Sequence, residues 1–281
     1  MSTKAQKKMK MAAQGICRLT GLEGSFVDSH ILPRALTRPP TTGAKIRETA
    51  LEQRPISRPP SWYDNRLVTR AGEDILEAID TEAISQLRQH RLVWTSFPND
   101  APFSADDVMS LGAEVNFGVR VLNLEDARAL RLFFLSVVWR AAESTRREFE
   151  DVQLEPAVLQ DIRERVLAKD PGDPWDYPIF LDQIITRGTW HNRTPIMESV
   201  GVPNAARTGV FLLPCVRIYV DGLVAKVAIS DAHKLNRGDS SSLVLGASQA
   251  LTIAARTFEE SRTSQDMLEV MEDNVRRGCL F

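Results

Sequence analysis

The feature that most limits how this chain can fold is a proline-rich stretch at residues 33–61. Proline lacks a backbone N–H, so it neither continues a helix nor pairs inside a central strand. A loop of this length in a compact protein is usually functional or partly disordered. The prolines in it are Pro33, Pro39, Pro40, Pro55, Pro59 and Pro60. Regular structure is therefore expected mainly on either side of the stretch.

Short apolar segments flank this loop. Residues 25–31 predict one strand and residues 63–69 a second. Residues 72–89 then predict a helix, because apolar side chains recur every four positions from Ile75 to Leu87. The expected order is strand, long loop, strand and helix.

Charge is distributed unevenly along the chain. Residues 1–72 carry 13 Lys and Arg against 5 Asp and Glu, whereas the whole chain of 281 residues has a net charge of −2. A basic segment of this kind suits a polyanion such as nucleic acid, because each neutralised phosphate releases counterions. A solvated basic surface, or a basic arm docked on the acidic remainder, is the alternative interpretation.

The remainder of the chain is predicted to be mostly helical. Asp221-Gly222, flanked by apolar residues, predicts a β-hairpin over 209–229. We divide the chain into a basic arm at 1–14, a first unit at 15–98 and a mostly helical domain at 99–281. The helices expected in this domain run from Asn123 to about Arg147, from Pro156 to about Ala168, from Asp173 to Gly188, and over about 245–260 and 264–277.

Cysteine usage and hydropathy exclude several classes of protein. Cys17, Cys215 and Cys279 are odd in number and far apart, which argues against a disulfide framework and a four-cysteine zinc site. The longest mostly apolar stretch, Leu132–Trp139, is too short to span a membrane. No signal-peptide pattern follows the basic N-terminus. We expect a cytoplasmic protein that does not bind membranes.

The residues that carry chemistry are concentrated around His30. The sequence reads Cys17-Arg18-Leu19-Thr20-Gly21, and then Ser29-His30-Ile31-Leu32-Pro33 after a short gap. A strand that delivers a histidine to the start of a basic loop suits phosphodiester cleavage. An imidazole with a pKa near 6.5 can act as a general base on water, and a divalent cation can stabilise the phosphate charge.

Residues 15–80 resemble the HNH, or ββα-metal, endonuclease family, in its branch with Cys-x-x-Thr-Gly followed by Ser-His-Ile-x-Pro. The resemblance implies an α+β chain in which a small ββα-metal unit precedes the mostly helical domain. It implies metal-dependent hydrolysis of DNA, with His30 as general base and Asn65 holding the loop and the base in place.

The same resemblance implies the metal ligands. The family's last ligand falls on Glu73 or Asp74, with Asp28 as a further carboxylate. These oxygen donors favour Mg²⁺ or Mn²⁺. No structural zinc is expected, because Thr20 stands where the second cysteine of the family's zinc knuckle would fall.

DNA is the expected partner, and the domain at 99–281 offers a surface for homo-oligomer assembly. Arginines that follow His30 can bind phosphate as planar forks. The residues expected to contact nucleic acid are Arg34, Arg38, Lys45, Arg47 and Arg66.

The departures from the family pattern support an alternative function. The final histidine is absent, and Ser29 precedes the base where many members carry an acidic ligand. Acidic residues such as Glu73 and Asp74 also complement the dipole of a helix's first turn without binding metal. The alternative is a catalytically inactive HNH-like module that binds nucleic acid or protein.

Overall fold

The centre of the fold is a seven-stranded mixed sheet. The structure is a computed structural model that describes residues 13–39, 46–48, 56–58, 61–98, 103, 107–111, 117–203, 209–230, 232–235, 237–238 and 240–278. The strand order is β10-β11-β12-β9-β13-β8-β7, and every neighbouring pair is antiparallel except β9 and β13. The strands are β7 (Met109–Ser110), β8 (Gly118–Asn123), β9 (Ile179–Ile184), β10 (Ile196–Pro203), β11 (Val210–Val220), β12 (Leu223–Ala228) and β13 (Ala250–Arg256).

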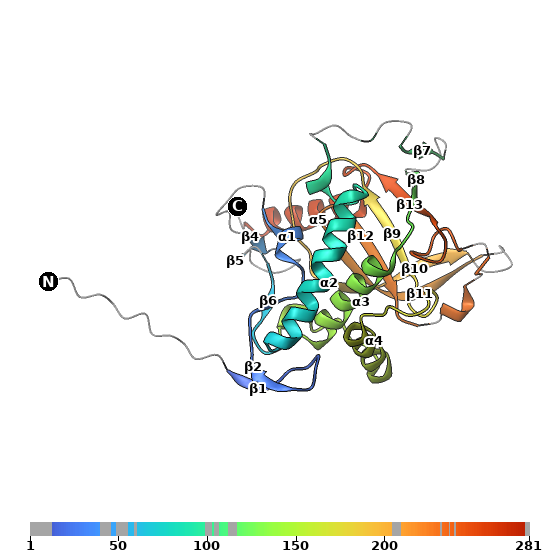
Figure 1. The fold of residues 1–281 in the computed structure, drawn as a ribbon. Coiled ribbons are helices and arrows are strands. Elements are labelled where there is room, and N and C mark those ends of the chain that lie inside the picture. Colours follow the sequence, from blue (N-terminus) through green and yellow to red (C-terminus); the bar gives the residue numbers. More distant parts are fainter. Residues whose placement is uncertain are drawn as a thin grey trace.

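Helices α2 and α3 cover one face of this sheet, and α4 lies beside α3 (Figure 1). The helices are α1 (Arg34–Thr37), α2 (Arg70–Gln89), α3 (Arg128–Glu143), α4 (Pro156–Ala168) and α5 (Arg262–Arg276), with single 3₁₀ turns η1 (Trp94–Ser96), η2 (Arg147–Phe149) and η3 (Ala232–Lys234). Three two-stranded ladders come from the first part of the chain: β1 (Gln14–Ile16) with β2 (Glu23–Ser25), β3 (Ser29–His30) with β6 (Tyr63–Asp64), and β4 (Ile46–Glu48) with β5 (Ile56–Arg58).

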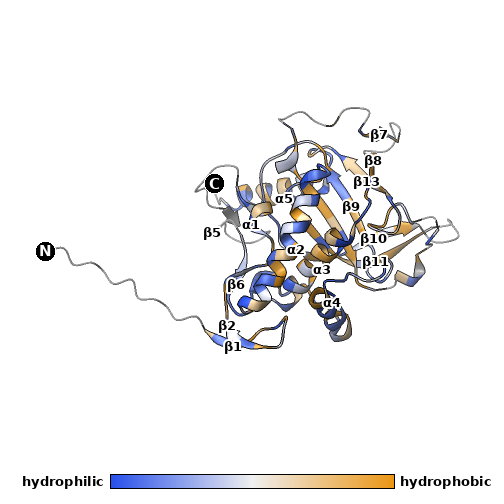
Figure 2. Ribbon diagram, viewed as in Figure 1, coloured by the Kyte–Doolittle hydropathy of each residue, from blue (hydrophilic) through white to orange (hydrophobic). Residues whose placement is uncertain are grey.

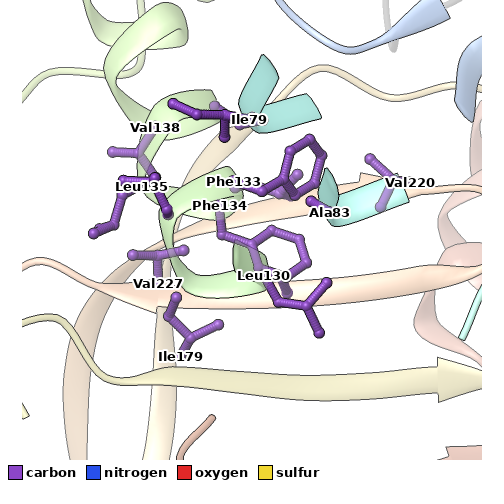
Figure 3. Close-up of a cluster of buried hydrophobic side chains, with 14 of the residues drawn as sticks. Ile79, Ala83, Leu130, Phe133, Phe134, Leu135, Val138, Ile179, Val220 and Val227 are labelled. Carbon is purple, nitrogen blue, oxygen red and sulfur yellow. The ribbon is translucent and has the colours of Figure 1, made fainter. Parts of the chain in front are cut away.

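The main core lies between α2, α3 and the sheet. Thirteen of the sixteen residues of α3 are buried, as expected of a helix that is apolar on nearly all sides. Phe133 and Phe134 of α3 belong to the same buried cluster as Ala83 of α2 and the strand residues Val220 and Val227 (Figure 3). This cluster includes residues of the first unit, such as Cys17, and residues of the sheet, such as Ile253. The first unit and the sheet therefore share one hydrophobic core. Figure 2 shows hydrophobic residues concentrated in α3 and the central strands.

The opposite face of the sheet is covered by aromatic side chains and by α5. Alternate residues of β11 point to opposite faces, so Val220 enters the main core while Tyr219 packs against Trp94 and Phe258. Met267 of α5 packs against this second cluster. Both faces of the central strand β12 are therefore covered, whereas Val121 of β8 stays 56% exposed.

The expected fold class was wrong. Residues 179–184 form β9 and residues 250–256 form β13, where we expected helices at 173–188 and 245–260. Asp173 makes a local turn, accepting a hydrogen bond from the backbone N–H of Trp175 at 2.8 Å, but no helix follows. The part after residue 98 is thus built on a large mixed sheet, and the chain is a mixed α/β fold.

Other elements were predicted well. The hairpin over 209–229 is confirmed as β11 and β12, with Asp221 and Gly222 in the turn. Helix α4 matches its expected bounds, and α2 and α5 differ from theirs by two residues or fewer. Helix α3 is shorter than expected, because Asn123 ends strand β8. Among the described helices, none combines the length and apolar composition needed to cross a bilayer.

We expect Gly222→Ala to destabilise the fold. Gly222 has φ +87°, and a Cβ there would lie 2.2 Å from Nε1 of Trp94. Backbone strain and the clash together should lower the free energy of unfolding by about 3 kcal/mol. Gly278→Ala is the matched control, since Gly278 has φ +69° and nothing within 4 Å of the added Cβ. Equal losses for the two variants in denaturant unfolding would contradict the proposed contact with Trp94.

Candidate functional site

The candidate site is built on the ladder between β3 and β6. Ser29 pairs with Asp64 and His30 pairs with Tyr63. Since side chains alternate along a strand, His30 and Tyr63 share the outer face, whereas buried Ser29 and Asp64 share the inner face. Helix α2 follows β6, but α1, β4 and β5 lie between β3 and β6, and the strands expected at 25–31 and 63–69 are reduced to two residues each in this ladder.

A buried arginine of α3 fixes the backbone of His30. Nη1 of Arg140 donates to the carbonyl oxygen of His30 at 3.0 Å. The same guanidinium donates to both carboxylate oxygens of Asp80, at 3.0 and 2.7 Å. The Arg140 side chain is only 1% exposed. Arg140 thereby joins β3, α2 and α3 at one point. Sequence reasoning missed this role: Arg140 is one of two buried arginines in α3, and its partners lie 60 and 110 residues away in the sequence.

The surroundings of His30 favour its neutral form. Burial lowers the pKa of the half-buried imidazole, and the positive charges of Arg34 and Arg140 lower it further. The carboxylates of Asp80 and Asp28 oppose this shift without reversing it. Because the pKa of His30 lies below its ordinary value of 6.5, the ring is mainly neutral at pH 7 and can accept a proton.

Glu73 lies on the inner side of the ladder, next to Ser29. The pKa of Glu73 is raised, because burial disfavours its charged form. The Ser29 hydroxyl and the charge of Arg140 offset only part of this shift. Neither Oε2 of Glu73 nor Oγ of Ser29 makes a hydrogen bond within the described residues, although both atoms are buried. Buried polar oxygens are rarely left unpaired. The two buried oxygens lie close to each other, since the Ser29 hydroxyl is near enough to lower the pKa of Glu73.

The other predicted ligand and positioning residues face solvent. Asp74 is exposed and pairs with Arg70 at 3.7 Å. Asp28 and Asn65 are also exposed, and Asp28 contributes only through its charge on His30. The structure therefore brings together His30 and Glu73 with Asp80 and Arg140, and leaves Asp74 outside this group.

Asp64, next to Asn65 in the chain, holds the second strand in place. Its Oδ2 accepts hydrogen bonds from the backbone N–H and hydroxyl of Thr145 and from the hydroxyl of Ser144, at 2.6, 2.9 and 3.0 Å. Burial alone would raise the pKa of Asp64, but these hydrogen bonds and one from the N–H of Arg66 lower it. Asp64 therefore ties β6 to the end of α3, whereas Asn65, which the resemblance expects to hold the loop and the base in place, is exposed.

Three of the five predicted phosphate-binding residues can be placed at the surface. Arg34, at the start of α1, Arg38 and Arg66 are exposed. Lys45 lies outside the described residues, and so does the side chain of Arg47, whose backbone belongs to β4. Arg34 is close enough to His30 to lower the pKa of its ring.

The donor set fits a hard divalent cation better than a zinc ion. In the described part of the chain, no three His, Cys, Asp or Glu side chains are placed to bind one metal together. Mg²⁺, however, is commonly held by one or two protein groups, with water and substrate phosphates completing its shell. In this site the Glu73 carboxylate lies beside the Ser29 hydroxyl.

Two other features, a pocket at the start of α3 and a buried histidine, are weaker candidates for a functional site. A pocket of about 240 Å³ lies at the start of α3, far along the helix from Arg140, and both acidic and basic residues line it, including Glu125, Asp126 and Arg128. His191 stacks on Tyr219 with ring centroids 4.4 Å apart, and burial lowers the pKa of His191 to about 4. This imidazole belongs to the aromatic packing on the second face of the sheet.

Comparison with family models, with curated proteins and with solved structures finds no match to this chain. The site therefore has to be interpreted from its own residues.

We expect Asp80→Ala to destabilise the protein by about 3 kcal/mol, because it leaves the buried charge of Arg140 unpaired. Asp74→Ala is the matched control on the same helix. Its partner Arg70 is exposed, so this variant should lose less than about 1 kcal/mol. Denaturant unfolding measures both. Similar losses for the two variants would contradict the importance assigned to the buried pair.

We also expect Arg34→Gln to raise the pKa of His30, because it removes a nearby positive charge. An NMR titration of the imidazole measures this, and Arg38→Gln serves as control. The lowered pKa of His30 also means that the unfolded chain binds this proton more readily. Its contribution to stability should therefore be complete above pH 6.5 and decline as the pH falls toward the folded-state pKa. A folded-state pKa above 6.5 would contradict both expectations.

Proposed function

We propose that this protein hydrolyses phosphodiester bonds of nucleic acid, with His30 as the general base. The observation that carries the proposal is a neutral, half-buried imidazole at the end of β3, held by Arg140 and followed by the exposed Arg34. Neutral histidine is the commonest general base, and arginine is suited to hold a phosphate beside it.

The roles of the residues follow from their positions. A ring nitrogen of His30 accepts a proton from the attacking water. Arg140 keeps the backbone of His30 fixed through the 3.0 Å hydrogen bond, and Asp80 keeps Arg140 in place. Arg34 binds the phosphate and helps to keep His30 unprotonated. Cys17 and Cys215, both free thiols, agree with action in the cytoplasm.

A divalent cation such as Mg²⁺ or Mn²⁺ fits the inner side of the ladder. Glu73 would hold it through the unpaired Oε2, with the Ser29 hydroxyl beside it. When bound, the cation supplies positive charge to the phosphate and the leaving oxygen. This assignment gives His30 and Glu73 separate tasks, as their places on the outer and inner sides of the ladder require.

We expect His30→Ala to lower the rate of cleavage about 100-fold or more, because a general base contributes at least that much. Glu73→Gln should lower it as well, since the amide removes the negative charge that attracts the cation. The measurement is cleavage of labelled duplex DNA, single-stranded DNA and RNA with Mg²⁺ or Mn²⁺.

The matched control is His90→Ala. His90 is a partly buried histidine at the other end of α2, and its pKa is also lowered by burial. If His90→Ala and His30→Ala cleave equally well, His30 is not the base. If the wild-type protein cleaves none of the substrates with either metal, the proposed function is wrong.

A second candidate, a binding module without catalysis, is favoured by one observation. Ser29 occupies the position before His30, and Asp28 and Asp74 face solvent, so Glu73 is the one predicted carboxylate ligand on the inner side. Nucleic-acid binding that survives in EDTA, without cleavage under any metal condition, would identify this candidate.

A further inference from the structure

Tyr63 is an exposed aromatic side chain beside His30. It is 36% exposed, and it is the only aromatic residue among the exposed large hydrophobic side chains of the described part of the chain. Its ring centroid lies 6.4 Å from that of His30, with the two planes at 61°. The cross-strand pairing places both rings on the outer face of the ladder. A ligand that reaches His30 from this face also meets Tyr63.

The position of Tyr63 is fixed from the end of α3. Nη1 of Arg146 donates to the carbonyl oxygen of Tyr63 at 3.1 Å, and Asp64 is anchored by Ser144 and Thr145. The guanidinium carbon of Arg146 lies 6.0 Å from the Tyr63 ring centroid. Tyr63 is thus presented on a held strand, which reduces the entropy lost when a ligand stacks on it.

The surroundings of this face are basic. Arg34 acts on His30 through its charge, Arg66 is exposed just after β6, and the side chain of Arg147 is 89% exposed. Asp28 is exposed and acts on His30 through its charge, Glu148 pairs with Arg146 at 2.7 Å, and Glu150 pairs with Arg147 at 3.8 Å. An aromatic ring among arginines is the combination that binds single-stranded nucleic acid, by stacking bases and tracking the backbone.

We propose that Tyr63 is a stacking platform for an unpaired base, and that the substrate is therefore single-stranded nucleic acid. The inference rests on the proposed function, since it places the base next to the phosphate that His30 would attack. In a duplex the bases are already stacked and paired, and extruding one costs free energy. The chemistry of stacking is common to single-stranded DNA and RNA.

The test measures binding separately from cleavage. Fluorescein-labelled 20-nucleotide single-stranded DNA, RNA of the same sequence and blunt duplex DNA are titrated in EDTA with the full chain. We expect Tyr63→Leu to bind the preferred single strand roughly 10-fold more weakly or worse. Tyr63→Phe keeps the ring and should bind like the wild type. Val121→Ala, at an exposed position of β8, is the control for loss of an exposed apolar side chain.

The outcomes separate the two ideas. Weaker binding of single strands by Tyr63→Leu, with normal binding by Tyr63→Phe and unchanged binding of duplex DNA, supports the platform. Whichever of single-stranded DNA and RNA binds more tightly is then identified as the substrate. Equal binding by Tyr63→Leu and wild type, or equal losses for duplex and single strand, overturns it. If wild type cleaves DNA or RNA while Tyr63→Leu binds normally, this inference alone fails. If binding depends on Tyr63 but nothing is cleaved with Mg²⁺ or Mn²⁺, the proposed hydrolysis alone fails.

Discussion

The contact between Arg140 and Asp80 is the interaction on which the arrangement of the site depends. A guanidinium that is 1% exposed must be fully paired, because an unpaired buried charge costs several kcal/mol. Its five donors satisfy a carboxylate on α2, a hydroxyl and a carbonyl on α3, and the carbonyl of His30 on β3. A short ladder of two residues per strand has little stability of its own. The hydrogen bonds of the buried Arg140 therefore hold His30 in place relative to α2 and α3, which the short ladder alone could not do.

The ladder separates the two kinds of chemistry that the site offers. The inner face holds Ser29 and Asp64, and Glu73 approaches it from the first turn of α2. The outer face holds His30 and Tyr63. Proton transfer and base stacking are thus assigned to one side, and cation binding to the other.

Local signals in the sequence were sufficient for some elements and for part of the site. Asp221-Gly222 specified its hairpin, and the structure places His30 on β3 and Glu73 in the first turn of α2. Strand β13 was misjudged because its alanines favour a helix, although Leu251, Ile253 and Ala255 alternate with more exposed residues. Arg140 and Asp64 could not be foreseen, since their partners lie 60 to 110 and about 80 residues away in the sequence. Such partners follow from the tertiary fold.

Strand β13 lies between β9, with which it is parallel, and β8, with which it is antiparallel. Before residues 250–256 leave the ribosome, the sheet consists of two separate pieces, β10-β11-β12-β9 and β8-β7, each with an open edge. Exposed strand edges pair readily with other chains. Strand β13 therefore covers the edge of β9 and the edge of β8 at the same time, and a chain that ends before residue 250 would leave both edges without their partner.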